Sequence, residues 1–245
     1  MEAASSIPFL FGNSADWVRM RGVTSADLVF ATGNRAKLGQ LAFVMAWLRA
    51  PFRLVSARER YGDRAAYEEV GGRAATIAAR GAQEVAGRLG IPVVVEDTTF
   101  HVEALGGGPG VHAAEYLKEH GCAGILKALG EAQDRTAWIV SAVAWATPEG
   151  DVQVWTNTLV GHIAHRVWAV QGMPEWVGPS LEHPLGGGYN AIFIPLGEAR
   201  TLAEIPPQEA ISSGYREPNF CALLAFLRAR PIRRRLTTTP SARLG

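Results

Sequence analysis

The sequence has few cysteines, no dominant sign of charge and no long apolar run. Its two cysteines, Cys122 and Cys221, lack CxxC spacing, which argues against a disulfide framework or a zinc site. The formal net charge is only +1, so nothing draws the chain generally to nucleic acid or to acidic membranes. No run of about eighteen apolar residues is present, as a membrane-spanning helix would need. We therefore expect a soluble cytoplasmic protein with neither a nucleic-acid nor a membrane partner.

The composition is that of a chain with a sizeable core. Of its 245 residues 48% are hydrophobic and only 19% are charged. No polar stretch rich in Gly, Ser and Pro divides the interior, so one domain is expected over residues 27–229. Residues 1–26 lack clear periodicity and are predicted to form an N-terminal extension. Residues 230–245, which are rich in arginine, are predicted to be a flexible, solvated tail.

Strand and helix patterns alternate in mixed order along the chain. Apolar runs and turn residues predict strands at 28–32, 52–55, 92–95, 137–145, 152–160 and 190–195. Apolar periodicity predicts helices at 35–49, 72–89 and 217–229, and one or two helices within 113–129. This order predicts an α/β or α+β fold with a mixed sheet.

The segment Thr32–Lys37 joins a short apolar strand to a helix through a sharp turn at Gly33. Such a turn directs free backbone N–H groups and the helix dipole at the space above it, an arrangement that favours phosphate. Asn34 is a good N-cap residue, and the ammonium of Lys37 in the first helical turn can reach a phosphate. An ordinary strand–turn–helix junction would look the same, so this segment alone leaves both interpretations open.

Carboxylates follow the apolar run at 93–95. Glu96 and Asp97 are adjacent in an expected strand, so their side chains point to opposite faces and only one should meet a given ligand. Glu68 or Glu69, just before the second helix, could supply another carboxylate. Mg²⁺ takes hard oxygen ligands, usually one or two carboxylates together with substrate phosphates. The pattern is typical of a magnesium site that acts on a nucleotide, although each acid alone could be an ordinary surface residue.

Motifs of several other enzyme classes are missing. The glycine-rich stretch 106–110 does not have GxGxxG spacing, and the segment after Gly33 does not have the GxxxxGK[ST] spacing of a P-loop. The histidines show no HExxH spacing, and no GxSxG elbow occurs. These absences disfavour a dinucleotide-binding dehydrogenase, a zinc protease and a serine hydrolase of the α/β type.

Taken in order, four stretches resemble the inosine/xanthosine triphosphate pyrophosphatases, the Ham1-like enzymes. They are Phe30–Asn34 with Lys37, Val95–Thr98 followed by 104–110, Gly188–Phe193 and Thr201–Pro206. The resemblance runs from about Leu28 to Leu227. It implies an elongated mixed β-sheet flanked by helices, in two lobes with a central cleft, in a chain that forms a homodimer. It also implies Mg²⁺-dependent hydrolysis of a nucleoside triphosphate to the monophosphate and pyrophosphate.

The resemblance also implies roles for particular residues. Glu68 is similar in position to the metal-binding glutamate of the family, and Asp97 to its catalytic, metal-linked aspartate, so these two form the expected catalytic and metal-binding pair. Arg80 stands where the family usually has a lysine. The other residues expected at the substrate are Thr32, Gly33, Asn34, Lys37, Glu96, Tyr189, Asn190, Tyr215 and Arg216.

The base-reading part departs from the family pattern. An aromatic residue and an acid that help to hold the purine are replaced by Gly187 and Asn190. Of the later elements that read the base, only Arg216 remains, after Gly214 and Tyr215. An apparent insertion at 162–188 contains Trp168, Met173 and Trp176. It is expected either to wall a new pocket or to be a surface loop that packs on the core.

The phosphate and metal residues are thus retained while the base-reading residues are rewritten. We therefore expect a nucleoside triphosphate pyrophosphatase whose base differs from inosine or xanthosine, as a pathway of modified-nucleoside biosynthesis would require. Two alternatives stay open. One is a non-catalytic protein that binds or senses a nucleotide on the same fold, and the other is housekeeping removal of dITP and XTP.

Overall fold

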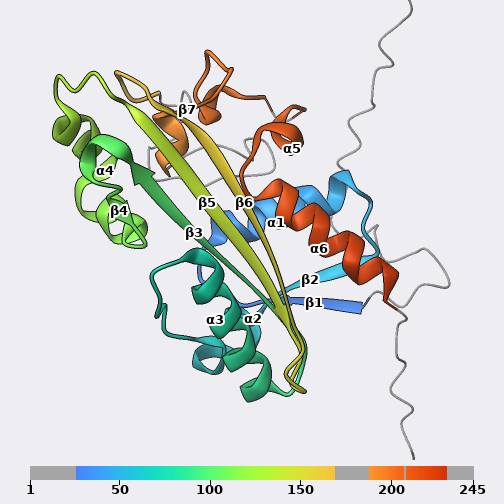
Figure 1. Cartoon of the computed structure of the whole chain (residues 1–245). Coiled ribbons are helices and arrows are strands. Elements are labelled where there is room, and N and C mark those ends of the chain that lie inside the picture. Colours follow the sequence, from blue (N-terminus) through green and yellow to red (C-terminus); the bar gives the residue numbers. More distant parts are fainter. Residues whose placement is uncertain (1–25, 169–187, 207, 231–245) are drawn as a thin grey trace, which may run out of the picture.

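A mixed sheet runs through the centre of the computed structural model, which describes residues 26–168, 188–206 and 208–230 (Figure 1). The strands are β1 (Ala26–Phe30), β2 (Phe52–Ser56), β3 (Val93–Val102), β4 (Pro109–Gly110), β5 (Thr136–Ala146), β6 (Val152–Ile163) and β7 (Phe193–Pro195). The α-helices are α1 (Arg35–Trp47), α2 (Ala57–Tyr61), α3 (Ala74–Leu89), α4 (Ala113–Leu129), α5 (Ala210–Ser213) and α6 (Glu217–Ala229). Short 3₁₀ turns are η2 (Gly62–Ala65), η3 (Glu103–Leu105), η4 (Gly188–Ala191) and η5 (Leu202–Glu204). Within these ranges, no helix combines the length and the apolar character that crossing a bilayer requires.

The sheet joins a small parallel part to a long antiparallel part. The strand order is β2-β1-β3-β5-β6-β7, with β4 beside β3. β1 is parallel to both β2 and β3, whereas β5, β6 and β7 continue the sheet in antiparallel pairs. The register between β1 and β3 consists of one pair, Phe30 with Val94. The predicted mixed sheet flanked by helices is confirmed, and this narrow connection divides it into two lobes.

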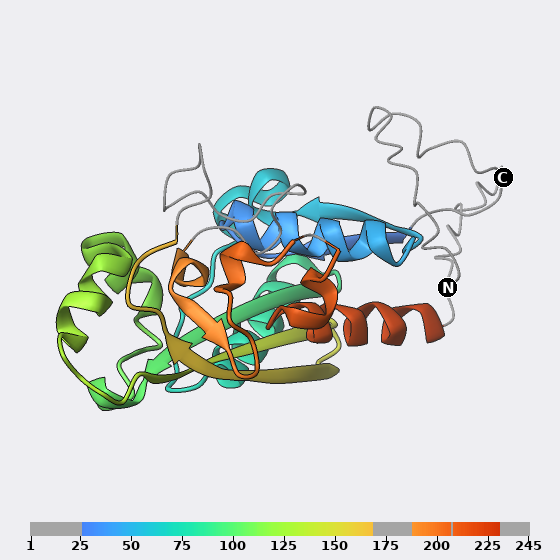
Figure 2. The same cartoon turned by 90° about the horizontal axis from the view of Figure 1, so that it is seen from above.

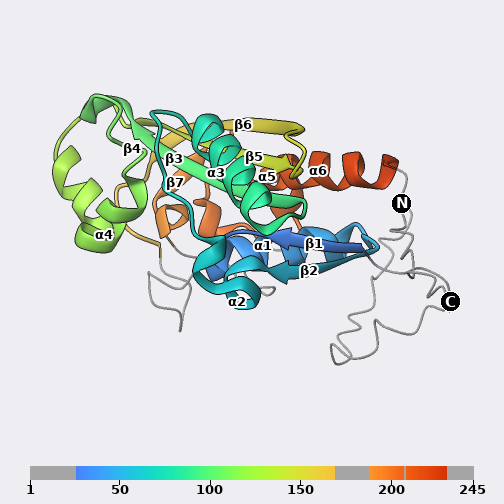
Figure 3. The same cartoon turned by 90° about the horizontal axis from the view of Figure 1, so that it is seen from below.

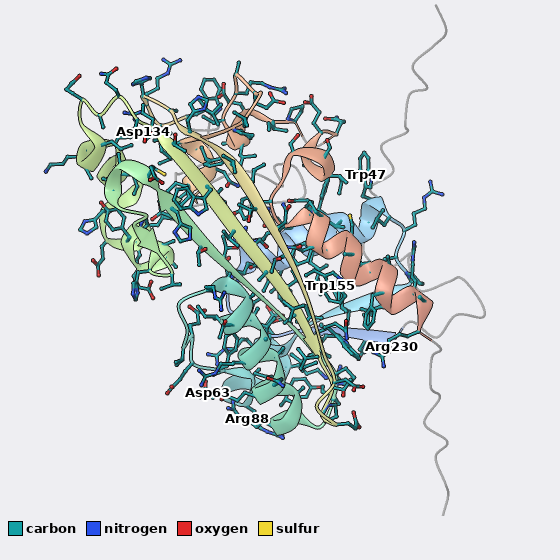
Figure 4. The ribbon with its side chains drawn as sticks, viewed as in Figure 1. Trp47, Asp63, Arg88, Asp134, Trp155 and Arg230 are labelled. Atoms are coloured by element: carbon teal, nitrogen blue, oxygen red, sulfur yellow. The ribbon has the colours of Figure 1, made fainter. Side chains whose placement is uncertain are left out.

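Helices cover both faces of the sheet because side chains alternate along each strand. Val93 and Val95 of β3 pack in a core with the alanine-rich face of α3, while Val94 between them belongs to the core on the other face. Figure 3 shows α3 along one face, and α1 and α6 lie across the other. Figure 4 shows Trp155 of β6 beside α6, where its ring meets Phe226 at 5.3 Å between centroids.

α4 lies at the opposite end of the long strands from α6 (Figure 2). Its helix is interrupted at Gly121, whose φ of 62° breaks the helical path, so one assigned element contains two helical pieces. The sequence pattern allows one or two helices in this segment, and the structure has two helical pieces that meet at Gly121. The N-terminal piece of α4 and the turn η4 together form the wall of a cleft that opens between the lobes.

Several boundaries differ from the sequence predictions. β1 ends at Phe30, so Thr32 belongs to the turn, and β3 continues beyond Asp97 to Val102. Trp168 is 39% exposed, and its backbone N–H donates to the carbonyl of Ala191. The rest of the apparent insertion from 169 onward, including Met173, Trp176 and Gly187, lies outside the described residues. So do almost all of the expected N-terminal extension and C-terminal tail, and the expected domain limits remain predictions.

Candidate active site

The turn between β1 and α1 forms one end of a cleft of about 990 Å³. Thr32, Gly33, Asn34 and Lys37 all line this cleft. The Thr32 hydroxyl accepts from the Asn34 backbone N–H at 3.0 Å, and the Asn34 side chain accepts from the N–H of Ala36 at 2.8 Å. Asn34 is therefore the N-cap of α1, as the sequence predicts. The capped turn presents the start of a thirteen-residue helix to the cleft, which is a favourable position for an anion.

Lys37 crosses from α1 to β3. Its ammonium donates to the backbone carbonyl of Glu96 at 2.8 Å and lies 3.0 Å from the Glu96 carboxylate. The side chain therefore ties the phosphate-type turn to the central strand. It still borders the cleft, where a bound anion could share its charge.

Glu96 is fully buried beneath the cleft. Its carboxylate accepts from Arg216 Nε at 2.9 Å and Ser141 Oγ at 3.1 Å, and also from the hydroxyl of Thr98. Burial alone would raise the pKa of this carboxyl, but Arg216 and Lys37 outweigh it and lower the pKa to about 2. Glu96 is thus ionised and paired with two cations, and it is not among the residues that line the cleft.

Asp97 points to the opposite face of β3 and lines the cleft. It is 6% exposed, and its Oδ2 has no hydrogen-bond partner within the described part of the chain. Burial raises its pKa to about 6, assisted by Glu96 and Glu69 and opposed by Lys37. The alternation expected for the two adjacent acids is therefore present, with one carboxylate internal and one directed at the cleft.

Glu69, and not Glu68, lines the cleft. Both residues are exposed, but only Glu69 contributes to the raised pKa of Asp97, so its charge lies near that carboxylate. Arg80 of α3 is exposed and does not line the cleft either. The residue pattern allows either glutamate, but the family resemblance assigns the metal-binding role to Glu68; in the structure it is Glu69 that lines the cleft and lies near Asp97.

Tyr67 is a cleft residue that no motif or pattern in the sequence indicates. Its ring packs against the alanine-rich core beneath α3. Burial, and then the charges of Glu69, Asp97 and Glu96, raise the pKa of its hydroxyl. The hydroxyl therefore stays protonated and can only act as a donor to an anionic partner.

The far end of the cleft is mainly apolar. Tyr189 stacks on Phe100 with 4.1 Å between ring centroids, and its hydroxyl donates to the carbonyl of Ala113 at 2.8 Å. Asn190 is buried beside it at 3% exposure. The remaining lining at this end comes from Val111, Ala113, Ala114, Leu117, Ile139 and Gly188.

Arg216 is held by internal partners. Besides Glu96, its guanidinium donates to Gln40 Oε1 at 2.7 Å and to the Tyr215 hydroxyl at 2.6 Å. Tyr215 and Arg216 line the cleft but are 6% and 7% exposed, so both present little surface to a ligand. The arginine that the resemblance assigns to the base therefore also serves as the counter-ion of Glu96.

Glu217 is a second buried acid in this network. It is fully buried, and its carboxylate accepts from the Arg216 backbone N–H at 3.1 Å and from Gln40 Nε2 at 3.3 Å. Gly214 permits this arrangement, since a Cβ there would lie 1.8 Å from the carboxylate. Burial raises the pKa of Glu217 to about 7 despite the nearby Arg216 charge.

The donor set suits a hard divalent cation shared with a ligand. No group of three or more His, Cys, Asp or Glu side chains in the described ranges could hold a metal by itself. Asp97 has a buried oxygen without a partner, and Glu69 adds a second carboxylate at the cleft. Mg²⁺ commonly takes only one or two carboxylates and completes its shell with phosphate and water oxygens. Asp97 and Glu69 therefore fit such an ion when a phosphate chain is also bound.

Comparison with known proteins agrees with this geometry. The profile of the Ham1 family matches residues 28–226. A dITP/XTP pyrophosphatase of Pyrobaculum aerophilum is 33% identical over 198 residues, covering 80% of this chain and 94% of that protein. One of Methanopyrus kandleri is 36% identical over 140 residues, or 57% and 67% of the two chains. The solved HAM1 protein from Coxiella burnetii superposes with a TM-score of 0.67 at 23% identity, over 84% of this chain and all of that one. The chain belongs to the Ham1 family.

Proposed function

We propose that this protein hydrolyses a nucleoside triphosphate to the nucleoside monophosphate and pyrophosphate in the cleft between its lobes. The observation that carries the proposal is one wall that combines a capped helix N-terminus with an aspartate holding a buried, unpartnered oxygen. The first feature favours phosphates, and the second offers an oxygen to a metal or to water. The curated relatives described above are named as pyrophosphatases of this kind, which supports the same reaction.

In this proposal, separate residues bind the phosphates, activate water, hold the metal and support the cleft wall. The turn at Thr32–Lys37 binds and orients the phosphate chain. Asp97 orients and deprotonates the water that attacks the α-phosphorus, and a pKa of about 6 suits a base that works near neutral pH. Asp97 and Glu69 would hold Mg²⁺, which supplies charge neutralisation for the triphosphate and its leaving group. Glu96 and Arg216 fix β3 and the segment before α6, and so keep the wall rigid.

We further propose that the base differs from hypoxanthine or xanthine. A site that reads a six-position oxygen needs polar groups aimed at it, and unmatched groups of this kind discriminate strongly. Here the Tyr189 hydroxyl and the Arg216 guanidinium have internal partners, and most of the surrounding lining is aliphatic or aromatic. We expect such a wall to bind a base through stacking and apolar contacts rather than through hydrogen bonds to a carbonyl oxygen.

A homodimer is the assembly that we propose. β7 pairs with β6 only at 161–163, so the preceding part of β6 has no strand neighbour on that side within the described residues. Val154 and Val160 on this strand are 39% and 45% exposed. An open edge with exposed apolar side chains is a surface that proteins usually cover. Light scattering coupled to size-exclusion chromatography measures the assembly, and a monomer at micromolar concentration would contradict it.

Product analysis tests the reaction. The full chain is incubated with Mg²⁺ and a panel containing dITP, XTP, the canonical triphosphates and purine-modified triphosphates, in water labelled with ¹⁸O. We expect monophosphate and pyrophosphate, with the label in the monophosphate, and a higher kcat/KM for a modified purine than for dITP or XTP. Diphosphate with orthophosphate would contradict the reaction type. Binding without turnover across the panel would favour a nucleotide sensor, and a preference for dITP or XTP would favour the housekeeping role.

A further inference from the structure

Tyr67 and Gly81 form a matched pair behind the carboxylates. Tyr67 lies in the segment before α3, and Gly81 lies within α3. A Cβ added at Gly81 would lie 2.6, 2.8 and 3.0 Å from the Cδ2, Cε2 and Cγ atoms of the Tyr67 ring. Contacts that short do not occur, and they involve the body of the ring as well as its edge. The absence of a side chain at residue 81 is thus what lets the ring pack closely against α3.

Packed against α3 in this way, Tyr67 brings its phenol hydroxyl to the cleft, and this hydroxyl has no hydrogen-bond partner in the described part of the chain. The ring packs on the core under α3, and Tyr67 lines the same cleft as Lys37, Glu69 and Asp97. No hydrogen bond in the described part of the chain uses the Tyr67 hydroxyl. Tyr67 is partly buried and lines the cleft, so a molecule bound there can accept a hydrogen bond from its hydroxyl. The hydroxyl is protonated at neutral pH and requires an acceptor that carries negative charge or a lone pair.

We propose that the Tyr67 hydroxyl donates a hydrogen bond to the phosphate chain of the bound nucleotide, and that Gly81 positions the ring for this contact by leaving room for it. This inference rests on the proposed function for the identity of the substrate. A phosphate oxygen fits better than a carboxylate of the wall, because Glu69 and Asp97 are to be shared with a cation when the substrate is bound. A neutral donor also strengthens phosphate binding without adding a charge that would repel that cation.

Three substitutions test the proposal, and the third is a matched control. Tyr67→Phe keeps the ring and removes the donor, and we expect kcat/KM to fall about 10- to 100-fold, the range for a hydrogen bond to a charged acceptor. Gly81→Ala displaces the ring and should produce a similar loss. Gly87→Ala introduces the same methyl group in the same helix, where nothing lies within 4 Å, and should leave kcat/KM unchanged. The double variant Tyr67→Phe/Gly81→Ala should lose no more than Tyr67→Phe, because both changes act through one hydroxyl.

Binding of inorganic pyrophosphate with Mg²⁺, measured by calorimetry, separates this proposal from the proposed function. We expect Tyr67→Phe to weaken pyrophosphate binding by about the same factor as it lowers kcat/KM, with its melting temperature unchanged. Wild-type pyrophosphate affinity and wild-type kcat/KM in Tyr67→Phe would overturn the proposal. So would an altered pH profile with unchanged affinity, since the hydroxyl would then act on Asp97. If the wild-type chain binds pyrophosphate but hydrolyses no nucleotide, the proposed function fails while the Tyr67 comparison keeps its meaning.

Discussion

The buried carboxyl of Glu217 makes a prediction about stability and pH. Its pKa rises from 4.5 to about 7 in the folded protein because the side chain is buried against Gln40 and the Arg216 backbone. At 1.36 kcal/mol per pH unit, this difference corresponds to about 3 kcal/mol. Between the two values, the native state binds the proton that the unfolded state has released. The free energy of unfolding therefore falls as pH rises from about 4.5 to about 7.

Glu217→Gln removes this titration. We expect the difference in unfolding free energy between variant and wild type to change by about 2 to 3 kcal/mol between about pH 5 and pH 8, in favour of the variant at high pH. For a protein of this size that is about 5 to 10 °C in Tm. The amide NH₂ faces Gln40 Nε2 unfavourably, but this penalty does not vary with pH. Asp97 titrates in both proteins, so its contribution cancels in the difference.

Thermal or urea unfolding at a series of pH values measures the difference. Glu103→Gln, at an exposed acid in η3, is the control and should run parallel to the wild type at every pH. Carbonyl ¹³C shifts of the Glu217 side chain report the titration directly. A variant curve that also runs parallel to the wild type, or a Glu217 signal that titrates near 4.5, would refute the reasoning.

Three further predictions concern the cleft. Asp97→Asn should lower kcat by about 10²- to 10⁴-fold because it removes the base, while Tm should not fall because it also removes a buried charge. Steady-state kinetics and a melting curve measure both effects. Near-normal turnover would show that Asp97 is not the base. Glu69→Gln should raise the Mg²⁺ concentration needed for half-maximal activity several-fold whereas Glu68→Gln should not, which a magnesium titration of both variants decides. Lys37→Met leaves the buried Glu96 with one cation fewer, so we expect a loss of about 3 to 5 kcal/mol in unfolding free energy, and chemical denaturation that shows no loss would contradict the buried pairing.

Local patterns predicted the sheet and part of the site. The period of two along β3 placed Glu96 and Asp97 on opposite faces, since neighbouring strand residues cannot share one. The strand–turn–helix pattern located Asn34 as the cap of α1. Both predictions depend on residues that are adjacent in sequence, where geometry leaves few choices.

The rest depended on contacts between distant segments. Which of Glu68 and Glu69 meets Asp97 is decided in a stretch without helix or strand, where no periodicity fixes the direction of a side chain. Tyr67 becomes a cleft residue only because α3 has a glycine opposite its ring. Arg216 was expected at the base, but its charge pairs with Glu96, which lies far away in the sequence. No pattern within a short window contains these pairings.

The distribution of charge explains why a metal belongs in the proposed reaction. Lys37 and Arg216, which both line the cleft, are already paired with the buried Glu96. Arg35 and Arg58 at the cleft are exposed, so water and salt screen their attraction for a phosphate. Asp97 and Glu69 add negative charge where a triphosphate would bring still more. The protein alone therefore leaves a bound triphosphate under-compensated, and a divalent cation between these carboxylates and the phosphates is the simplest way to balance the site.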